Sequence, residues 1–327
     1  MGFGIIALVT SKKINEPLSL FLRQVKRSII YIINPISGTR SKTYLWKKIE
    51  EKTERKNIPY QIFSSVSDGD YSFLHSIIQE KNITDVVVAG GDGTLSQVVA
   101  SLKNFNLNFG IIPCGSGNGL ALAAKISTNF SKAIDTVLTN NASFIDAFFV
   151  NNQFACMLCG LGFDAKIAKD FAGNPNRGLM TYLKLCMKNF WKMKPHPFEI
   201  QTGGDSLKTN AYFISIANSN QFGNHFTIAP KASLSDGLLD IVIVLNQNKI
   251  TLIIQLLKQL VGWNKLQSTI SLQNKKGIVY FQTNKLTIRN SSFAPLHIDG
   301  EPIETYKLLT VEIKKNYFKL IQPALPQ

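Results

Sequence analysis

Residues 85–100 read Asp-Val-Val-Val-Ala-Gly-Gly-Asp-Gly-Thr-Leu-Ser-Gln-Val-Val-Ala, and this stretch decides the fold of the N-terminal half of the chain. The apolar run 85–89 is typical of a buried strand, and residues 95–100 are typical of a helix. The glycines between them let backbone N–H groups approach an anion, and the helix N-terminus that follows favours negative charge. The stretch therefore predicts a strand, a phosphate-sized turn and a helix.

Asp92 lies inside this turn, where a carboxylate would repel bare phosphate. Its charge is explained if it meets Mg²⁺ on a nucleotide, or the hydroxyl that attacks the nucleotide. The alternative is an ordinary strand-to-helix turn in which Asp92 caps the next helix, because glycine-rich turns of this kind are common.

Two further strand–turn–helix units flank this one. The first spans residues 28–57 with a polar turn at 34–40, and the second spans 109–125 with a glycine-rich turn at 113–119. The carboxyl ends of parallel strands meet at one edge of the sheet, where open α/β folds bind ligands. The sequence therefore predicts an open α/β nucleotide-binding domain whose three turns converge.

Past residue 145 the alternation of strands and helices gives way to short runs rich in β-branched and aromatic residues, which predicts an antiparallel β-sandwich. Apolar residues at helical spacing predict two helices within it, at Leu179 to Lys192 and Ile250 to Val261. The expected strands are 146–159, 197–202, 210–217, 226–229, 238–245, 268–273, 277–288, 294–298 and 306–313.

Six motifs in this order resemble those of the diacylglycerol kinase and sphingosine kinase superfamily, the lipid kinases with a diacylglycerol kinase catalytic domain. The motifs are Asn34–Gly38, Gly90–Thr94, Pro113–Ala121, Gly160–Asp164, Ala229–Ala232 with Asp236–Asp240, and Asp299–Pro302. The spelling of residues 115–121 looks closer to the sphingosine kinase version.

The resemblance implies two domains, similar to those of NAD kinases and diacylglycerol kinases. Residues 26–143, joined by the chain end 316–327, are expected to form the ATP-binding domain. Residues 144–315 are expected to form the sandwich that binds the lipid, and 1–25 an extension of uncertain role.

The resemblance also implies ATP-dependent transfer of the γ-phosphate to a hydroxyl of a lipid, either diacylglycerol or a sphingoid base, in the cleft between the domains. ATP and Mg²⁺ are the implied cofactors. Arg40 is the one fixed cation expected in the first loop, because the family has no Walker lysine. The implied ATP-binding residues are Asn34, Ser37, Gly38, Arg40, Ser65, Gly91, Asp92, Gly93, Thr94, Ser116, Gly117 and Asn118.

For the catalytic base, the resemblance offers Asp92, and Glu301 with its neighbour Asp299. We favour Asp92 and Glu301 as a pair around Mg²⁺ and the substrate hydroxyl, because carboxylates on opposing domains assemble only when the cleft closes. The alternative for residues 299–302 is a β-turn, and both interpretations can hold together.

The resemblance assigns substrate and metal roles in the second half. Asp164 is expected to contact the lipid headgroup, and Arg177 the transferred phosphoryl group, although an exposed loop arginine is the alternative for Arg177. Ser233, Asp236 and Leu238 match positions that hold a structural Mg²⁺ in soluble bacterial diacylglycerol kinases, although this turn could stand without metal.

The chain carries a net charge of +15, which predicts an anionic partner. No nucleic-acid partner is expected, because the basic residues are scattered and no zinc-finger or ribonucleoprotein signature accompanies them. Anionic lipid headgroups fit better, since each basic residue near such a surface contributes about 1 kcal/mol. A solvated basic surface is the alternative.

No apolar stretch reaches the ~20 residues of a membrane-spanning helix. Cys156 and Cys159 have the spacing of half a zinc site but no second cysteine pair, and are interpreted as buried apolar residues. The expected location is cytoplasmic, in peripheral contact with the anionic inner membrane face.

Two other functions remain open. NAD kinases share the Gly-Gly-Asp-Gly turn and a sandwich domain, and a lipid-binding protein without catalytic activity is the second alternative. One departure from the family pattern is Ser96-Gln97 in place of the frequent Asn-Glu, which removes a carboxylate near the expected metal. The sequence does not fix the oligomeric state and leaves a homodimer open.

Overall fold

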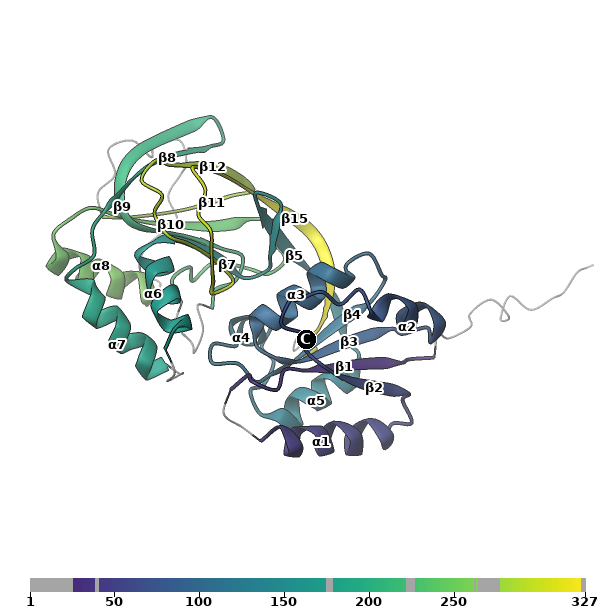
Figure 1. Cartoon of the computed structure of the whole chain (residues 1–327). Coiled ribbons are helices and arrows are strands. Elements are labelled where there is room, and N and C mark those ends of the chain that lie inside the picture. The colour runs from purple at the N-terminus through teal and green to yellow at the C-terminus, as the bar shows by residue number, and fades with distance from the viewer. Residues whose placement is uncertain are drawn as a thin grey trace, which may run out of the picture.

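The computed structural model describes residues 26–38, 41–174, 179–221, 227–261, 263 and 277–324. Figure 1 shows an N-terminal domain, in purple and blue, beside a second domain in teal to yellow. Four strands of the first domain run parallel in the order β2-β1-β3-β4, which confirms the predicted open α/β fold. They are β1 (Ile29–Ile33), β2 (Tyr60–Ser64), β3 (Asp85–Gly90) and β4 (Asn108–Pro113).

The helices of this domain cover both faces of the sheet. In Figure 1, α1 and α5 lie on one face and α2 and α3 on the other. Their bounds are α1 (Lys42–Glu54), α2 (Leu74–Glu80), α3 (Asp92–Leu102), α4 (Gly119–Ala123) and α5 (Phe130–Thr139). The sheet is buried on both sides as a result, and β1 and β3 consist of near-continuous apolar runs for that reason.

The second domain is the predicted antiparallel sandwich. The first half of β9 pairs with β8, and its second half crosses to pair with β7 and β10, so this one strand belongs to both layers. Its strands are β5 (Ala142–Val150), β6 (Gln153–Ala155), β7 (Leu158–Gly162), β8 (His196–Thr202), β9 (Asp205–Ala217), β10 (Leu239–Leu245), β11 (Ile278–Thr283), β12 (Lys285–Asn290), β13 (Leu296–Ile298), β14 (Glu301–Ile303) and β15 (Leu308–Ile321). Its helices are α6 (Phe163–Ala172), α7 (Leu179–Phe190) and α8 (Lys249–Leu260).

The long strands β5 and β15 run through both domains. In the sandwich, β15 pairs with β12 and β5, and its far end joins the first domain, where Lys319 and Leu320 pair in parallel with β4. The register between β5 and β15 shifts between Lys314 and Phe318. The buried carboxylate of Asp146 holds this irregularity by accepting the N–H of Asn316 at 2.8 Å.

Three details of the sandwich differ from the sequence-based expectation. A third helix, α6, follows β7 directly, and residues 227–229 form no strand. The run 277–288 divides into β11 and β12, because β11 pairs with β10 in one layer and β12 pairs with β8 and β15 in the other. The expected strand at 268–273 lies outside the described residues.

The cysteine prediction is confirmed. Cys156 and Cys159 are both buried. In the part of the chain that the structure describes, no helix has the length and apolar character needed to cross a membrane.

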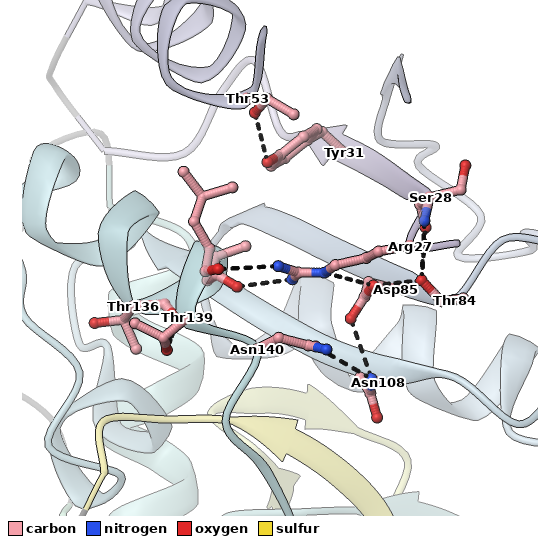
Figure 2. Close-up of polar contacts among 12 residues, drawn as sticks. Arg27, Ser28, Tyr31, Thr53, Thr84, Asp85, Asn108, Thr136, Thr139 and Asn140 are labelled. Carbon is pink, nitrogen blue, oxygen red and sulfur yellow. Dashed lines mark hydrogen bonds and ion pairs between the residues drawn. The ribbon is translucent and has the colours of Figure 1, made fainter. Parts of the chain in front are cut away.

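At the amino edge of the first sheet, Arg27 and Asp85 form a buried ion pair (Figure 2). Arg27 Nε lies 3.0 Å from Asp85 Oδ2, and the two side chains are 14% and 0% exposed. The same guanidinium donates to the carbonyls of Val137 and Leu138 at 2.7 and 3.2 Å. Arg27 thereby satisfies carbonyls in the last turn of α5, where the helix dipole favours a positive charge.

Replacing Arg27 with methionine is expected to lower the free energy of unfolding by about 3 kcal/mol, because Asp85 would stay buried without its charged partner. Equilibrium denaturation in urea measures this change. The double variant Arg27→Met/Asp85→Asn should recover most of the loss, since no uncompensated charge remains. A loss below about 1 kcal/mol in the single variant would show that the pair does not stabilise the fold.

Candidate active site

The loops that follow β1, β2, β3 and β4 meet at the carboxyl edge of the first sheet. The N–H of Asn34 donates to the carbonyl of Ala89 at 2.9 Å, and the N–H of Ser65 donates to that of Ile33 at 2.9 Å. The N–H of Cys114 donates to the carbonyl of Gly90 at 2.8 Å. These bonds extend the pairing of the strands by one residue, so the first residue of each loop lies beside its neighbour.

Glycines allow these loops to touch one another. Gly38 has a φ of +61°, and a Cβ there would lie 2.1 Å from the carbonyl oxygen of Cys114. A Cβ at Gly115 would lie 2.8 Å from the Cα of Gly91. Real Cβ atoms do not approach backbone so closely, so a larger residue at either position would force the loops apart. The loops therefore form one continuous cradle of exposed backbone.

Amide and hydroxyl side chains fix the shape of this cradle. Asn34 Nδ2 donates to Thr94 Oγ1 at 2.8 Å, and Asn118 Nδ2 donates to the carbonyl of Gly115 at 2.8 Å. Asn118 has a left-handed backbone, with φ +51°, at the start of α4. Its Oδ1 is buried and has no hydrogen-bond partner within the described residues. An unpaired buried acceptor is costly and fits a site that receives a donor or a cation.

Asp92 begins α3 and its carboxylate points at the start of α4. Oδ2 accepts the N–H of Gly119 at 2.7 Å and Oδ1 accepts that of Leu120 at 3.1 Å. Burial raises the pKa of Asp92 to about 6, and the negative charge of Asp299 adds to the rise. The two N–H donors lower the pKa but do not cancel this effect. Asp92 does cap a neighbouring helix, and each of its oxygens retains a lone pair for a ligand.

Glu301 comes to the same place from the second domain. It follows the hairpin turn Asp299–Gly300, in which both residues have positive φ, and it pairs with Ile298 across β13 and β14. This is the type I′ turn that Asp-Gly favours. A Cβ at Gly93 would lie 3.3 Å from Glu301 Oε1, so the glutamate side chain lies over the loop that carries Asp92.

Asp299 makes contacts with the protein itself. Its Oδ1 accepts the N–H groups of Met157 and Leu158 at 2.9 and 3.0 Å, and its Oδ2 accepts that of Cys156 at 3.0 Å. Ser96 of α3 donates its hydroxyl to the same Oδ2 at 2.6 Å. Asp299 thus ties the turn bearing Glu301 both to the entry of β7 and to the first domain. This geometry favours a positioning role over that of a base.

Asp164 lies on α6 in a buried pair with His297 of β13. Asp164 Oδ2 lies 2.9 Å from His297 Nε2, while His297 Nδ1 accepts the N–H of Gly300 at 3.3 Å. His297 Nδ1 therefore acts as the acceptor, and Nε2 is the nitrogen that donates to Asp164. A Cβ at Gly160 would lie 2.1 Å from Asp164 Oδ2, so the Gly160–Asp164 motif makes room for this pair. The second carboxylate oxygen of Asp164 is not used by His297.

Two family models match the chain. The diacylglycerol kinase catalytic domain matches residues 28–150, and the YegS C-terminal NAD kinase beta sandwich-like domain matches residues 158–321. The chain belongs to the diacylglycerol kinase family of lipid kinases. The family resemblance expected from the sequence is confirmed.

Individual relatives agree with this family. The chain is 26% identical over 286 residues to a diacylglycerol kinase of Bacillus subtilis, covering 85% of this chain and 90% of the relative. It is 25% identical to a probable YegS-like lipid kinase of Shewanella frigidimarina, covering 75% and 79%. A solved putative diacylglycerol kinase from Bacillus anthracis has the same fold, with a TM-score of 0.71 at 18% identity over 91% and 96% of the two chains.

The turn expected to hold a structural metal is closed by its own hydrogen bonds. Asp236 Oδ1 accepts the N–H of Leu238 at 3.0 Å, and Ser233 Oγ accepts that of Ser235 at 3.4 Å. Burial raises the pKa of Asp236 above its usual value. The Lys315 side chain packs over Gly237, and its positive charge offsets part of that rise. No cluster of three acidic, histidine or cysteine side chains suited to a metal occurs in the described part of the chain. The metal at Ser233, Asp236 and Leu238 stays a prediction.

The remaining expected site residues divide into two groups. Ser37, Ser65, Gly117 and Ser116 lie in the converging loops, where their contacts with ATP stay predictions, whereas Arg40 and Arg177 lie outside the described residues. Arg40 is not the one cation at the first loop, because Lys42 donates its ammonium group to the carbonyl of Ser37.

Sequence reasoning did not assign the contacts of three polar residues of this site, which are Lys42, Ser96 and His297. Lys42 lies at the start of the helix that follows the first loop. A lysine at this position in the sequence could have indicated an anion site. Ser96 and His297 contact residues far away in the sequence, so no local pattern identifies them.

Proposed function

We propose that the chain transfers the γ-phosphoryl group of ATP to a hydroxyl of a lipid, with diacylglycerol as the first candidate because a relative over most of its length is named a diacylglycerol kinase. The observation that carries this proposal is the position of the Glu301 side chain, which comes from the opposite domain and lies over Gly93, the neighbour of Asp92 in the glycine cradle. A sphingoid base is the second candidate acceptor. Both place a primary hydroxyl at the polar end of a long apolar molecule.

The residues present fit a nucleotide with Mg²⁺. Gly38, Gly91 and Gly115 leave backbone exposed where a Cβ would close the cradle, and the Lys42 ammonium group provides positive charge beside it. Oxygen ligands suited to Mg²⁺ are available on Asp92, Glu301 and the unpaired Asn118 Oδ1. When bound, ATP with Mg²⁺ supplies the transferable phosphoryl group and neutralises its charge.

Asp92 is the proposed base. A pKa of about 6 keeps its carboxylate ionised at neutral pH and close to the operating pH, which suits general base catalysis. The N–H groups of Gly119 and Leu120 hold the carboxylate in one orientation, so little reorganisation is needed when it accepts the proton of the lipid hydroxyl. Glu301 would orient that hydroxyl from the other side, and Asp164 would hold the headgroup.

The catalytic efficiency for the lipid is expected to rise with pH through about 6 and then level off. Below that value Asp92 is protonated, so log kcat/KM should fall with a slope of about 1 per pH unit. The contribution of Asp92 to the free energy of unfolding should instead fall as the pH rises. Because the folded-state pKa is raised above the ordinary value, this group stabilises the fold most at low pH, and its contribution is lost as pH rises through about 6. A profile that is flat from about pH 5 to 8 would exclude Asp92 as the base.

An NAD kinase-like phosphotransferase is the second candidate, because the model that matches residues 158–321 describes an NAD kinase beta sandwich-like domain. ADP formation from ATP and Mg²⁺, measured with diacylglycerol, sphingosine, ceramide, monoacylglycerol or NAD as acceptor, distinguishes the two. We expect turnover with a lipid and none with NAD above the rate without acceptor. Turnover with NAD alone would replace the lipid kinase proposal.

A further inference from the structure

The helix α8 exposes an apolar stripe on the face that points away from the sandwich. Ile250, Ile253, Ile254, Leu257 and Val261 recur at helical spacing and are 39% to 65% exposed. The opposite face of the helix already packs inward through Leu252, which is fully buried. The exposed stripe is therefore not needed to attach the helix to the domain.

The neighbouring helix α7 extends this surface. Met180, Met187 and Trp191 are each at least 65% exposed. Lys249 at the start of α8 joins the two helices, because its ammonium group donates to the carbonyl of Phe190 at 3.0 Å and also to that of Trp191. Figure 1 shows α7 and α8 on the same side of the second domain. We call the exposed apolar residues of both helices, with Trp191 and Val261, the α7–α8 face.

The charged side chains on α7 and α8 are all lysines. Residues 179–198 contain four lysines and no aspartate or glutamate, and residues 241–298 contain no acidic residue at all. Lys184, Lys188 and Lys192 are exposed beside Met187 and Trp191. Monomeric proteins rarely leave apolar patches of this kind exposed. Apolar side chains within a basic rim match the interface of an anionic bilayer, where the former enter the acyl boundary and the latter contact headgroups.

A second copy of the chain would fit this face poorly. A two-fold dimer would bring the same surface of both subunits together, so lysines of one copy would face lysines of the other. Like charges at an interface oppose association. The charge pattern therefore favours a lipid surface as the occupant.

The inner side of α7 packs on the helix that carries Asp164. The rings of Phe171 and Tyr182 lie 5.8 Å apart edge to face, and Asn189 Nδ2 donates to Asp170 at 3.3 Å. Burial raises the pKa of Tyr182, and the charge of Asp164 contributes to that rise. Only α7 thus separates the exposed apolar surface from the proposed headgroup site at Asp164. Docking of the outer side of α7 on a bilayer therefore brings the bilayer close to Asp164.

We infer that the α7–α8 face docks onto an anionic phospholipid bilayer and thereby presents the membrane-embedded lipid to the Asp164 side of the cleft. This inference rests on the proposed lipid kinase function and specifies the surface through which the acceptor is reached. It makes the contact with the membrane a property of the second domain.

Vesicle binding by the full chain tests the inference with a matched pair of variants. Leu257→Gln removes an apolar side chain of the α7–α8 face that is 59% exposed, and Leu308→Gln removes one of 50% exposure at the start of β15. On vesicles of phosphatidylglycerol and phosphatidylcholine, Leu257→Gln is expected to reduce the partition coefficient about tenfold or more, and Leu308→Gln less than about twofold. Equal binding by both variants would overturn the inference.

The charge component is tested in the same assay. Lys184→Gln/Lys188→Gln should weaken binding several-fold, whereas Lys47→Gln/Lys56→Gln on α1 and just after it should not, and vesicles of phosphatidylcholine alone should bind all variants weakly. Trp191 provides a direct signal in a Trp46→Phe/Trp263→Phe background, where it is the one remaining of the three tryptophans. Its fluorescence should shift to the blue on vesicle addition. An unshifted spectrum, or a dimer that Leu257→Gln dissociates while vesicle binding is unchanged, would overturn membrane docking by this face.

Failure of docking and failure of the kinase proposal are distinguishable. Leu257→Gln should phosphorylate a short-chain diacylglycerol dispersed in water as fast as the unaltered chain, while losing activity on vesicles. If the unaltered chain binds vesicles through the α7–α8 face but phosphorylates no lipid, docking stands and the kinase proposal fails. If it phosphorylates the dispersed lipid and Leu257→Gln is fully active on vesicles, docking is overturned and the kinase proposal stands.

Discussion

Replacement of Asp92 by asparagine is expected to reduce phosphoryl transfer about a thousandfold while leaving the protein folded. Asparagine cannot accept the proton of the lipid hydroxyl, and it offers no charge to a metal. It still accepts one of the two N–H groups, from Gly119 or Leu120, that Asp92 holds at 2.7 and 3.1 Å. Steady-state rates with ATP and a dispersed lipid measure the effect.

Stability should change little in this variant, because two consequences of the substitution oppose each other. One N–H loses its acceptor, which costs about 1 to 2 kcal/mol, but the partly buried charge that raises the pKa of Asp92 to about 6 is also removed. Asp135→Asn, an exposed carboxylate on α5, is the matched control and should be fully active. Full activity in Asp92→Asn would exclude this residue as the base.

Replacement of Asp299 by alanine is expected to lower the free energy of unfolding by roughly 4 to 6 kcal/mol. Three backbone N–H groups, of residues 156–158, would lose their acceptor in a buried environment, and the hydroxyl of Ser96 would lose its partner across the domains. Thermal unfolding should shift downward by roughly 10 °C. Activity should also fall, because the turn that presents Glu301 is held by these bonds.

Glu301→Gln distinguishes the role of Glu301 from that of Asp299. Glu301 is exposed at the end of the turn, so its replacement should leave the melting temperature unchanged while lowering kcat. If Asp299→Ala melted like the unaltered chain and Glu301→Gln did not, the roles assigned to the two residues would have to be exchanged.

The first domain could be predicted from sequence because its information is local. Each of the units around 28–57, 85–100 and 109–125 contains an apolar strand, a turn rich in glycine or polar residues, and a helix, and parallel pairing brings their turns to one edge. From the sequence alone, a bound anion explains the glycines of these turns. The structure adds that Gly38 and Gly115 are also required by contact between neighbouring loops.

The second domain was harder because its decisive contacts join distant residues. The apolar run through 154–163 gives no signal for the end of β7. The backbone turns at Gly162, whose φ is +84°, and α6 begins at the next residue, Phe163. The role of Asp299 depends on backbone N–H groups more than 140 positions earlier in the chain. A local motif identified the Asp-Gly-Glu segment but could not divide the roles of its two carboxylates.

Transfer of label from γ-labelled ATP to an extractable lipid tests the central claim most directly. The account predicts label in the lipid phase with Mg²⁺ and diacylglycerol or a sphingoid base, and none with the Asp92→Asn variant. Label that stays in the aqueous phase with every lipid offered, or that appears on NAD, would contradict the account.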